Sequence, residues 1–214
     1  MKIGLIGLAG AGKDTAADIL QRILSEHGKA YKIDRFAKPL KQAAREVFGD
    51  KFDDRDVKEV PVKVDQDTMI EASFKALRSC RLTDDEMDKA SELFFDHLGF
   101  LNILSPRKYQ QLLGTEVGRA ARSTVWSDRL TKSTANLIVP DVRFAGEVLD
   151  YNIFLTRHPV SLSGTPHTSE LLATEMQLGF DESYDAMFTN TGTIDELESK
   201  LRTHIETLIK NEVI

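Results

Sequence analysis

The sequence predicts an α/β protein of three layers, in which helices cover both faces of a mostly parallel sheet. Short apolar runs of the kind buried in parallel sheets recur along the chain, and amphipathic helical stretches separate them. A glycine-rich turn joins the first apolar run to the first helical stretch. The 214 residues are enough for one sizeable core, so we expect one domain with insertions.

The N-terminal elements are expected to form a strand, a helix and a second strand. Residues 2–6 are an apolar strand, and a helix with one apolar stripe begins at Lys13 and ends before Gly28. Residues 31–37 read as a short strand. The connection should be a right-handed crossover.

The middle of the chain is mainly helical. One helix opens at Pro39, and a capping box at residues 83–86 starts an amphipathic helix that ends at Gly99. Another helix begins at Pro106. Residues 50–67 carry many charges with little periodicity. We therefore expect a solvent-exposed segment outside the core, and we assign it no catalytic or binding role.

The C-terminal part returns to strands. Residues 135–141 form a buried strand with an acid at its end, and residues 151–157 form a further strand. Residues 185–190 are a candidate for the last strand, and a closing helix begins near Thr193.

Composition limits the classes of function. A net charge of −6 argues against a protein that coats nucleic acid, and no apolar stretch approaches the length of a membrane span. Cys80 is the single cysteine, so no intramolecular disulfide forms, and a small buried residue is the favoured interpretation. We expect a cytoplasmic protein whose partners are small molecules, neither a nucleic acid polymer nor a membrane.

The turn at residues 7–15, GLAGAGKDT, carries the clearest chemistry. Gly7, Gly12 and Lys13 match the pattern G-x-x-x-x-G-K, in which backbone N–H groups and a helix N-terminus hold phosphate oxygens. The strand before it and the helix after it supply the required context. We therefore predict a nucleotide phosphate site, in which Asp14 stands where a hydroxyl would normally bind magnesium.

A second candidate site follows the buried strand LIVPD. Asp141 lies at the carboxyl end of that strand, where open α/β sheets bind ligands, and could hold magnesium through water or cap the next helix. Arg143 could grip a phosphate or be a solvated charge. Glu147 follows four residues after Arg143.

Glu116 is unusual, because helical spacing places it within the apolar stripe of the helix after Pro106. A carboxylate there must be paired or face a cavity, and Arg119 is its nearest candidate partner. A structural pair and contact with a substrate are equally good interpretations.

Further candidates are weaker. Arg35 and Lys38 follow the second strand. They could bind a second phosphate, or they could be charged side chains exposed to solvent. Trp126 could stack on a base, although core packing is the more frequent role. Residues 157–170 suit a flap that closes over phosphates, with His167 as a hydrogen-bonding residue.

Several motifs, in order and spread over most of the chain, carry a family resemblance. They are GLAGAGKDT, RFAKPLK, LLGTE followed by Arg119 and Trp126, VPDVRFAGE and HTSE. Together they resemble the bacteriophage deoxynucleoside monophosphate kinases, within the P-loop nucleoside monophosphate kinase family. GKDT and FAxPLK are also similar to segments of phosphomevalonate kinases.

The resemblance implies a three-layer P-loop kinase fold over residues 1–214, with a helical substrate-binding insertion at about 37–125 and a short lid at about 157–182. It implies transfer of the γ-phosphoryl of ATP, with Mg²⁺, to a deoxynucleoside 5′-monophosphate. The location would be the cytoplasm, that of the host if a phage encodes the chain.

Matched residue by residue, the resemblance assigns three kinds of site. The ATP site comprises Gly10, Ala11, Gly12, Lys13, Asp14, Thr15 and Arg157. The substrate side comprises Arg35, Lys38, Glu116, Arg119, Trp126, Asp141, Arg143, Glu147 and the lid residue Glu170. The catalytic residues would be Lys13, Asp14 and Arg143. Thr15 and Asp141 would hold magnesium through water molecules. The lid has Arg157 as its single arginine, where adenylate kinases have several.

Other functions remain as alternatives. A kinase of another phosphorylated metabolite would share the same core, and a noncatalytic module would bind ATP without turnover. A GTP-dependent switch needs the motif N/T-K-x-D, and the closest segment, TKST at residues 131–134, lacks the aspartate. Base preference and the choice between monomer and homodimer stay open.

Overall fold

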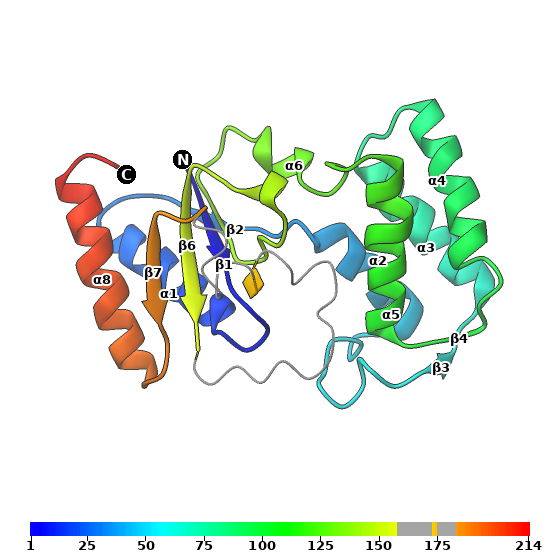
Figure 1. Ribbon diagram of the computed structural model, residues 1–214, viewed down its shortest axis with the longest axis horizontal. Coiled ribbons are helices and arrows are strands. Elements are labelled where there is room, and N and C mark those ends of the chain that lie inside the picture. Colours follow the sequence, from blue (N-terminus) through cyan, green and yellow to red (C-terminus); the bar gives the residue numbers. More distant parts are fainter. Residues whose placement is uncertain (158–172, 175–182) are drawn as a thin grey trace. The chain divides into compact units, whose positions relative to one another are not determined.

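The computed structural model describes residues 1–157, 173–174 and 183–214 (Figure 1). The chain divides into two compact units. Unit 1 comprises residues 1–35 and 130–214, and unit 2 comprises residues 36–129. No helix in the described part of the chain is both long and apolar enough to cross a membrane.

Unit 1 is built on a five-stranded parallel sheet in the order β2-β5-β1-β6-β7. Its strands are β1 (Lys2–Ile6), β2 (Lys32–Ile33), β5 (Leu137–Val139), β6 (Tyr151–Thr156) and β7 (Ala186–Thr189). Every residue of β5 and β6 is buried, as expected for strands covered on both faces. The predicted α/β fold with a parallel sheet flanked by helices is confirmed.

Two helices of unit 1, α1 (Lys13–Glu26) and α8 (Ile194–Lys210), pack against each other beside the sheet (Figure 1). The stripe predicted for α1 is buried in full, and the helix ends at Glu26, with His27 as its C-cap before Gly28 with φ 71°. α8 begins at Thr193 with a complete capping box. Their apolar faces share a core with β1, β5 and β6.

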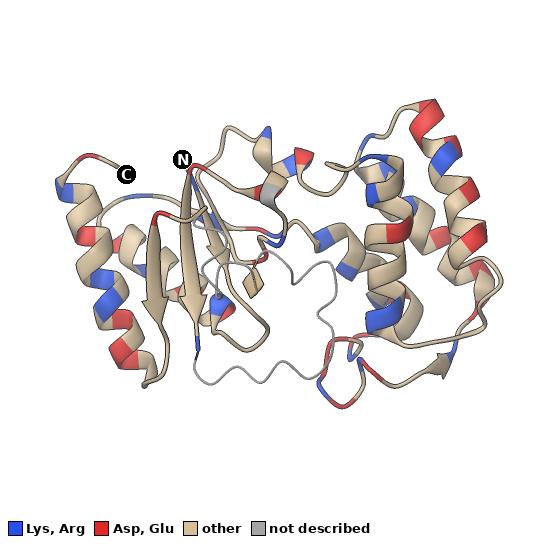
Figure 2. Ribbon diagram, in the orientation of Figure 1, with Lys and Arg blue, Asp and Glu red and all other residues tan. Residues whose placement is uncertain are grey.

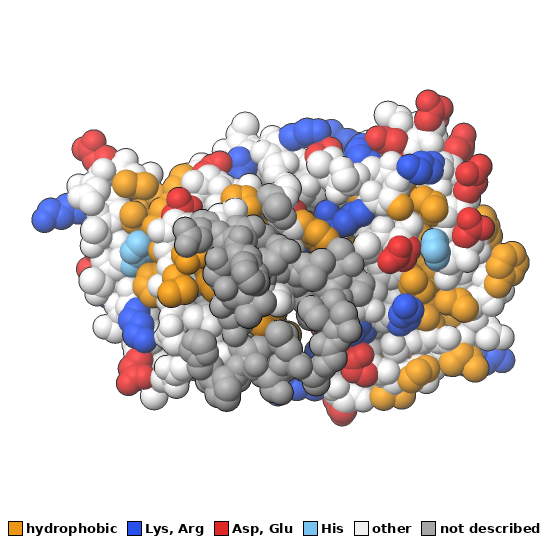
Figure 3. Space-filling model, viewed as in Figure 1, with side chains coloured by type: hydrophobic (Ala, Val, Ile, Leu, Met, Phe, Trp, Pro, Cys, Tyr) orange, Lys and Arg blue, Asp and Glu red, His pale blue; other side chains and the backbone are white. Residues whose placement is uncertain are grey.

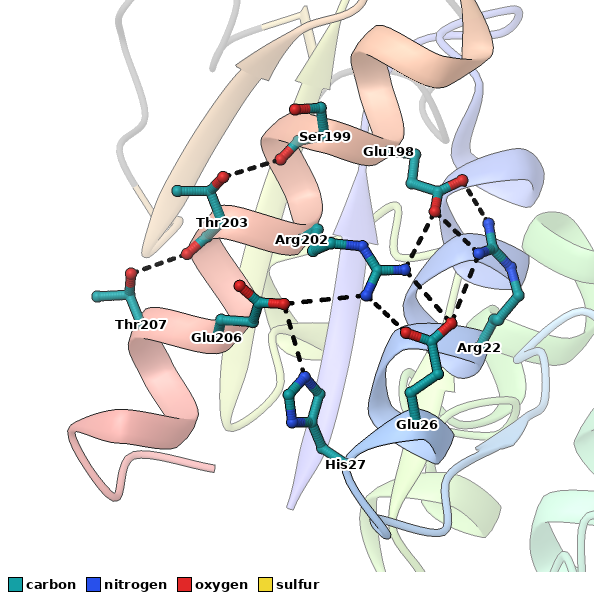
Figure 4. Close-up of polar contacts among 9 residues, drawn as sticks. All are labelled: Arg22, Glu26, His27, Glu198, Ser199, Arg202, Thr203, Glu206 and Thr207. Atoms are coloured by element: carbon teal, nitrogen blue, oxygen red, sulfur yellow. Dashed lines mark hydrogen bonds and ion pairs between the residues drawn. The ribbon is translucent and has the colours of Figure 1, made fainter.

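Charged side chains also join α1 to α8 (Figure 4). Arg22 donates to Glu198 at 2.8 Å, and Arg202 donates to both Glu198 and Glu26. Hydrogen bonds from Arg22 and Arg202 lower the pKa of Glu198 to about 2. The hydrogen bond from Arg202 likewise lowers the pKa of Glu26.

Unit 2 is mostly helical. It contains α2 (Lys38–Phe48), β3 (Val62–Lys63), α3 (Gln66–Ser79), α4 (Asp84–His97), β4 (Ile103–Leu104), α5 (Pro106–Gln111) and the π-helix η1 (Leu112–Arg119). Its core forms around Met69, Leu77, Phe94, Tyr109 and Trp126. β3 and β4 pair as a short antiparallel sheet. The short α6 (Asp128–Thr131) carries the chain back into unit 1.

The surface of unit 2 has an acidic part and an apolar part. Acidic side chains predominate on α4, whose N-terminus carries the predicted capping box of Thr83 and Glu86 (Figure 2). Apolar side chains gather near the connection from α4 to β4, where Phe100 is 83% and Ile103 62% exposed (Figure 3). Exposed apolar residues therefore follow the acidic helix α4 in the chain.

Three local expectations differ from the structure. Residues 31–37 contain only the two-residue strand β2. The region of residues 50–67 is not wholly solvated, because Phe52 is buried in the core of unit 2. α3 is not among the expected helices, although Asp65 caps its N-terminus and its buried residues recur at helical spacing. Ser73 interrupts the apolar stripe and donates a hydrogen bond to the Met69 carbonyl.

Candidate functional site

The glycine-rich turn connects β1 to α1 at the carboxyl edge of the parallel sheet. Gly12 has φ 92° and caps the N-terminus of α1 without a side-chain hydrogen bond. Gly7 approaches β6 so closely that a Cβ there would overlap the Leu155 carbonyl. Glycine is thus required at both ends of the turn. Because the N-cap residue Gly12 has no side chain to cap the first-turn amides of α1, this helix N-terminus has the character of an anion-binding site.

The carbonyl groups of the turn are held by donors of the protein itself. Lys13 Nζ donates to Gly7 O at 2.7 Å and to Leu8 O at 2.9 Å. Asn190 Nδ2 donates to Ala11 O at 2.9 Å. Carbonyl oxygens repel phosphate, so tying them to these donors leaves the opposite, amide side of the turn suited to an anion.

Arg157 lies near Gly10 of the same turn. It follows β6, and its Nη1 is 3.4 Å from Gly10 O, the long end of hydrogen-bond distance. The guanidinium is exposed, and together with Lys13 it places two positive charges on the turn. The cofactor-binding residue predicted from the start of the lid is therefore beside the predicted phosphate site.

Asp14 and Arg35 form an ion pair at 2.7 Å. Asp14 is in the first turn of α1, and Arg35 follows β2 as the last residue of unit 1 before the chain enters unit 2. Their side chains are 76% and 38% exposed. The structure thus brings a predicted ATP-side residue together with a predicted substrate-side residue.

The turn after β5 is organised by a buried carboxylate. Glu147, in the short 3-10 helix η2 (Ala145–Glu147), is 1% exposed. Its Oε2 accepts hydrogen bonds from the backbone N–H of Arg143 at 2.8 Å and of Phe144 at 3.3 Å. Glu147 therefore shapes the turn, while the Arg143 side chain is exposed and Asp141 is half-buried.

The two turns leave neighbouring strands. β5 pairs with β1 in parallel, with Gly4 opposite Val139, so the residues after each strand emerge at the same edge of the sheet. Asp141 follows β5, and Thr15 is half-buried in the first turn of α1. In the described part of the chain, no group of three or more His, Cys, Asp or Glu residues could hold a metal. A metal here would rely on few protein ligands.

Comparison with known proteins adds no family assignment. No protein-family model matches the chain, and no curated protein matches it. The parallel sheet with its glycine-rich turn is consistent with a P-loop-like fold. Interpretation of the site therefore depends on its residues and their contacts.

The predicted substrate-side residues of unit 2 lie on two elements. Lys38 is the first residue of α2, and Glu116 and Arg119 belong to η1. Glu116 is half-buried, and Arg119 Nη1 donates to the Ser123 carbonyl at 3.0 Å. The sequence places Glu116 within the apolar stripe by assuming α-helical spacing. A π-helix has wider turns, which changes the direction of its side chains.

Trp126 is packed in the core of unit 2, with 2% exposure. Its Nε1 donates to Gly114 O at 2.8 Å, and its ring lies so close to Gly118 that a Cβ there would overlap it. Both glycines belong to η1. The structure favours the core interpretation of this tryptophan over stacking on a base.

Two predicted lid residues, His167 and Glu170, lie outside the described residues, as does most of the expected lid at 157–182. One residue at the site has no counterpart in the sequence-based predictions. Asn190 reaches the turn from the end of β7, 179 residues away in the chain. The sequence feature that could have identified Asn190 is its position. A polar residue directly after a parallel strand lies at the edge of the sheet where ligands bind.

Proposed function

We propose that this protein is an ATP-dependent kinase that phosphorylates a deoxynucleoside 5′-monophosphate. The observation that carries the proposal is the turn between β1 and α1. Its carbonyls are held by Lys13 and Asn190, and the N-cap residue of the helix behind it, Gly12, provides no side-chain cap. That arrangement suits the phosphates of a nucleotide. The family resemblance supports the choice of acceptor.

Lys13 would change partners when ATP binds. Its ammonium now donates to the carbonyls of Gly7 and Leu8. The outer phosphates of ATP carry full negative charge and are stronger acceptors than these carbonyls. Lys13 would then neutralise charge that develops on the moving phosphoryl group, with Arg157 near Gly10 of the turn.

The residues at the sheet edge fit a magnesium ion. Thr15 offers a hydroxyl and Asp141 a carboxylate, which are hard oxygen ligands, and Mg²⁺ commonly keeps several waters and binds phosphate oxygens. When bound, the ion would neutralise charge on the phosphates. Asp14, held by Arg35 at 2.7 Å, would orient water molecules or the arginine near the phosphates.

The acceptor side would use Arg143 to bind the monophosphate. An oxygen of that phosphate attacks the γ-phosphorus in line, and the bond from the γ-phosphorus to the bridging oxygen of ADP breaks. The acceptor is already anionic, so no protein base is required. Catalysis then consists of alignment and charge neutralisation by Lys13 and the arginines.

An ADP-release assay tests this proposal, with ATP, Mg²⁺ and each of the deoxynucleoside monophosphates in turn. We expect turnover with at least one acceptor, formation of the diphosphate on anion exchange, and a loss of at least 100-fold in Lys13→Ala, on the scale of other electrostatic contributions. Lys89→Ala, at an exposed position of α4, is the matched control. Absence of turnover with every deoxynucleotide would overturn the proposal.

The same assay separates the alternatives. Turnover with a different phosphorylated metabolite, such as phosphomevalonate, would assign the chain to the second type of kinase that RFAKPLK resembles. ATP binding that Lys13→Ala abolishes, without turnover of any acceptor, would indicate a noncatalytic nucleotide-binding module.

A further inference from the structure

Asn190 joins the last strand of the sheet to the glycine-rich turn. Its backbone N–H donates to Thr156 O at 2.8 Å, which continues the pairing of β6 with β7 by one residue. Its side-chain Nδ2 donates to Ala11 O at 2.9 Å. The backbone of Asn190 is therefore anchored in the sheet while its amide holds the turn.

The amide of Asn190 also fits the space beside Gly12. A Cβ on Gly12 would overlap Asn190 Nδ2, so the amide nitrogen occupies the place that a side chain at residue 12 would need. Gly12 has φ 92°, a conformation that favours glycine. These two residues are adapted to each other.

One peptide unit contains both the Ala11 carbonyl and the Gly12 N–H. The unit is planar and trans, so the two groups point in opposite directions. A hydrogen bond that fixes the direction of the Ala11 carbonyl also fixes the direction of the Gly12 N–H. Without that bond, the freedom of glycine would allow this peptide unit to rotate and turn its carbonyl toward an anion.

We propose that Asn190 is a positioning residue for phosphate binding, which holds the Gly12 N–H toward the anion by binding the Ala11 carbonyl on the opposite side. This inference rests on the proposed function, because it assumes that the turn binds phosphate. Asn190 acts through the backbone of the turn, and contact with the nucleotide is not part of its role.

The role of Asn190 differs from that of Lys13. Lys13 also holds carbonyls of the turn, those of Gly7 and Leu8, but its ammonium would shift toward a bound phosphate. The amide of Asn190 is neutral and keeps its bond when the ligand arrives. It therefore holds the turn in both the empty and the occupied states.

The chemistry of the amide explains why asparagine suits this position. The interaction requires a donor, and a carboxylate at residue 190 would face the Ala11 carbonyl with a second acceptor. It would also add negative charge close to an anion site. Asn190→Asp should therefore be more harmful than Asn190→Ala, although aspartate has nearly the size of asparagine.

Calorimetric titration with tripolyphosphate, and with ATP and Mg²⁺, tests the inference on the full chain. We expect Asn190→Ala to bind both about 10-fold more weakly, in line with one lost hydrogen bond, and Asn190→Asp more weakly still. The KM for the acceptor should be unchanged. Asn211→Ala, at the exposed end of α8, is the control.

The NMR signal of the Gly12 amide provides a readout that a purely structural role would not move. In the wild type, tripolyphosphate should shift the Gly12 N–H signal, and in Asn190→Ala that shift should be much smaller. Thermal unfolding checks that each variant is folded at the assay temperature. A variant that is unfolded there would overturn the inference, because Asn190 would then be required for the fold.

Two further outcomes separate this inference from the proposed function. If the wild type binds tripolyphosphate and both Asn190 variants bind it equally well, the inference is overturned and the kinase proposal stands. If the wild type binds neither tripolyphosphate nor ATP, both fail. If binding and the Gly12 shift behave as expected but no deoxynucleotide is phosphorylated, the inference stands and the choice of acceptor is wrong.

Discussion

The carboxylate of Asp14 is 2.7 Å from the guanidinium of Arg35, which joins the first turn of α1 to the end of β2. A negative charge beside a phosphate site is thereby balanced by a cation, and it also lies favourably at a helix N-terminus. Arg35 is the last residue of unit 1 before the chain enters unit 2. The pair therefore links the phosphate turn to the point where the chain leaves the sheet.

We predict that Asp14→Asn lowers turnover far more than ATP affinity. Both side chains of the pair are partly or largely exposed, so its loss should cost about 1 kcal/mol of stability at most. Steady-state kinetics and ATP titration measure the two effects separately. Asp18→Asn, an exposed substitution on the same helix, is the control. If turnover and ATP affinity both change little and by equal factors, Asp14 has no role beyond that of a favourable charge at the helix N-terminus.

Glu147→Ala should weaken acceptor binding without changing ATP affinity. The substitution removes the oxygen that accepts the part-buried hydrogen bonds from the N–H groups of Arg143 and Phe144, and a typical hydrogen bond contributes about 0.5–1.5 kcal/mol. The turn that carries Arg143 should then loosen and raise the KM for the monophosphate. Glu147→Gln retains an acceptor oxygen and should be milder. An unchanged or lower KM for the monophosphate in Glu147→Ala would contradict this role.

Acid should remove the contribution of the ion network between α1 and α8. Hydrogen bonds from Arg22 and Arg202 hold the pKa of Glu198 at about 2, below its value of roughly 4.3 in an unfolded chain. A depressed folded-state pKa contributes stability above the unfolded pKa, and this contribution is lost as the pH falls from about 4.3 toward 2.

Thermal unfolding of the wild type and Glu198→Gln across this pH range measures the effect. The wild type should be the more stable at pH 6, and the difference should shrink on acidification and with added salt, which screens exposed charges. Glu92→Gln, at an exposed position of α4, is the control and should show no such trend. A difference in melting temperature that does not change with pH would refute this assignment.

Gly118→Ala should destabilise the protein by about 1–3 kcal/mol, the usual cost of overpacking a core. A Cβ at residue 118 would overlap the Trp126 ring, which is fully packed. Urea unfolding measures the change. Gly146→Ala is the control, because a Cβ there would meet no atom within 4 Å. Equal stability of the two variants would mean that η1 shifts freely away from Trp126.

The parts of the fold that follow from local patterns could be predicted from the sequence. The buried strands β5 and β6, the stripe of α1 and the capping boxes at Thr83 and Thr193 each depend on residues close in the chain. The glycine-rich turn is equally local, so its place between a strand and a helix was predictable.

Features that depend on distant contacts could not be predicted in this way. An α-helix and a π-helix have similar apolar patterns over eight residues. The choice of a π-helix for η1 therefore depends on its packing, which includes the hydrogen bond from Trp126 to the Gly114 carbonyl. Asn190 approaches Ala11 across 179 residues. The contact of Asp14 with Arg35 needs the sheet order, which no local motif supplies.

The strand order has a consequence for synthesis of the chain. β1 emerges from the ribosome long before both of its neighbours, β5 and β6, which follow residue 130. Unit 2 is continuous from 36 to 129 and can complete its core before those neighbours exist. During translation β1 therefore remains without sheet partners while more than a hundred residues are added. An apolar strand without sheet partners is a general risk for aggregation, so we expect this interval to be the vulnerable stage of folding.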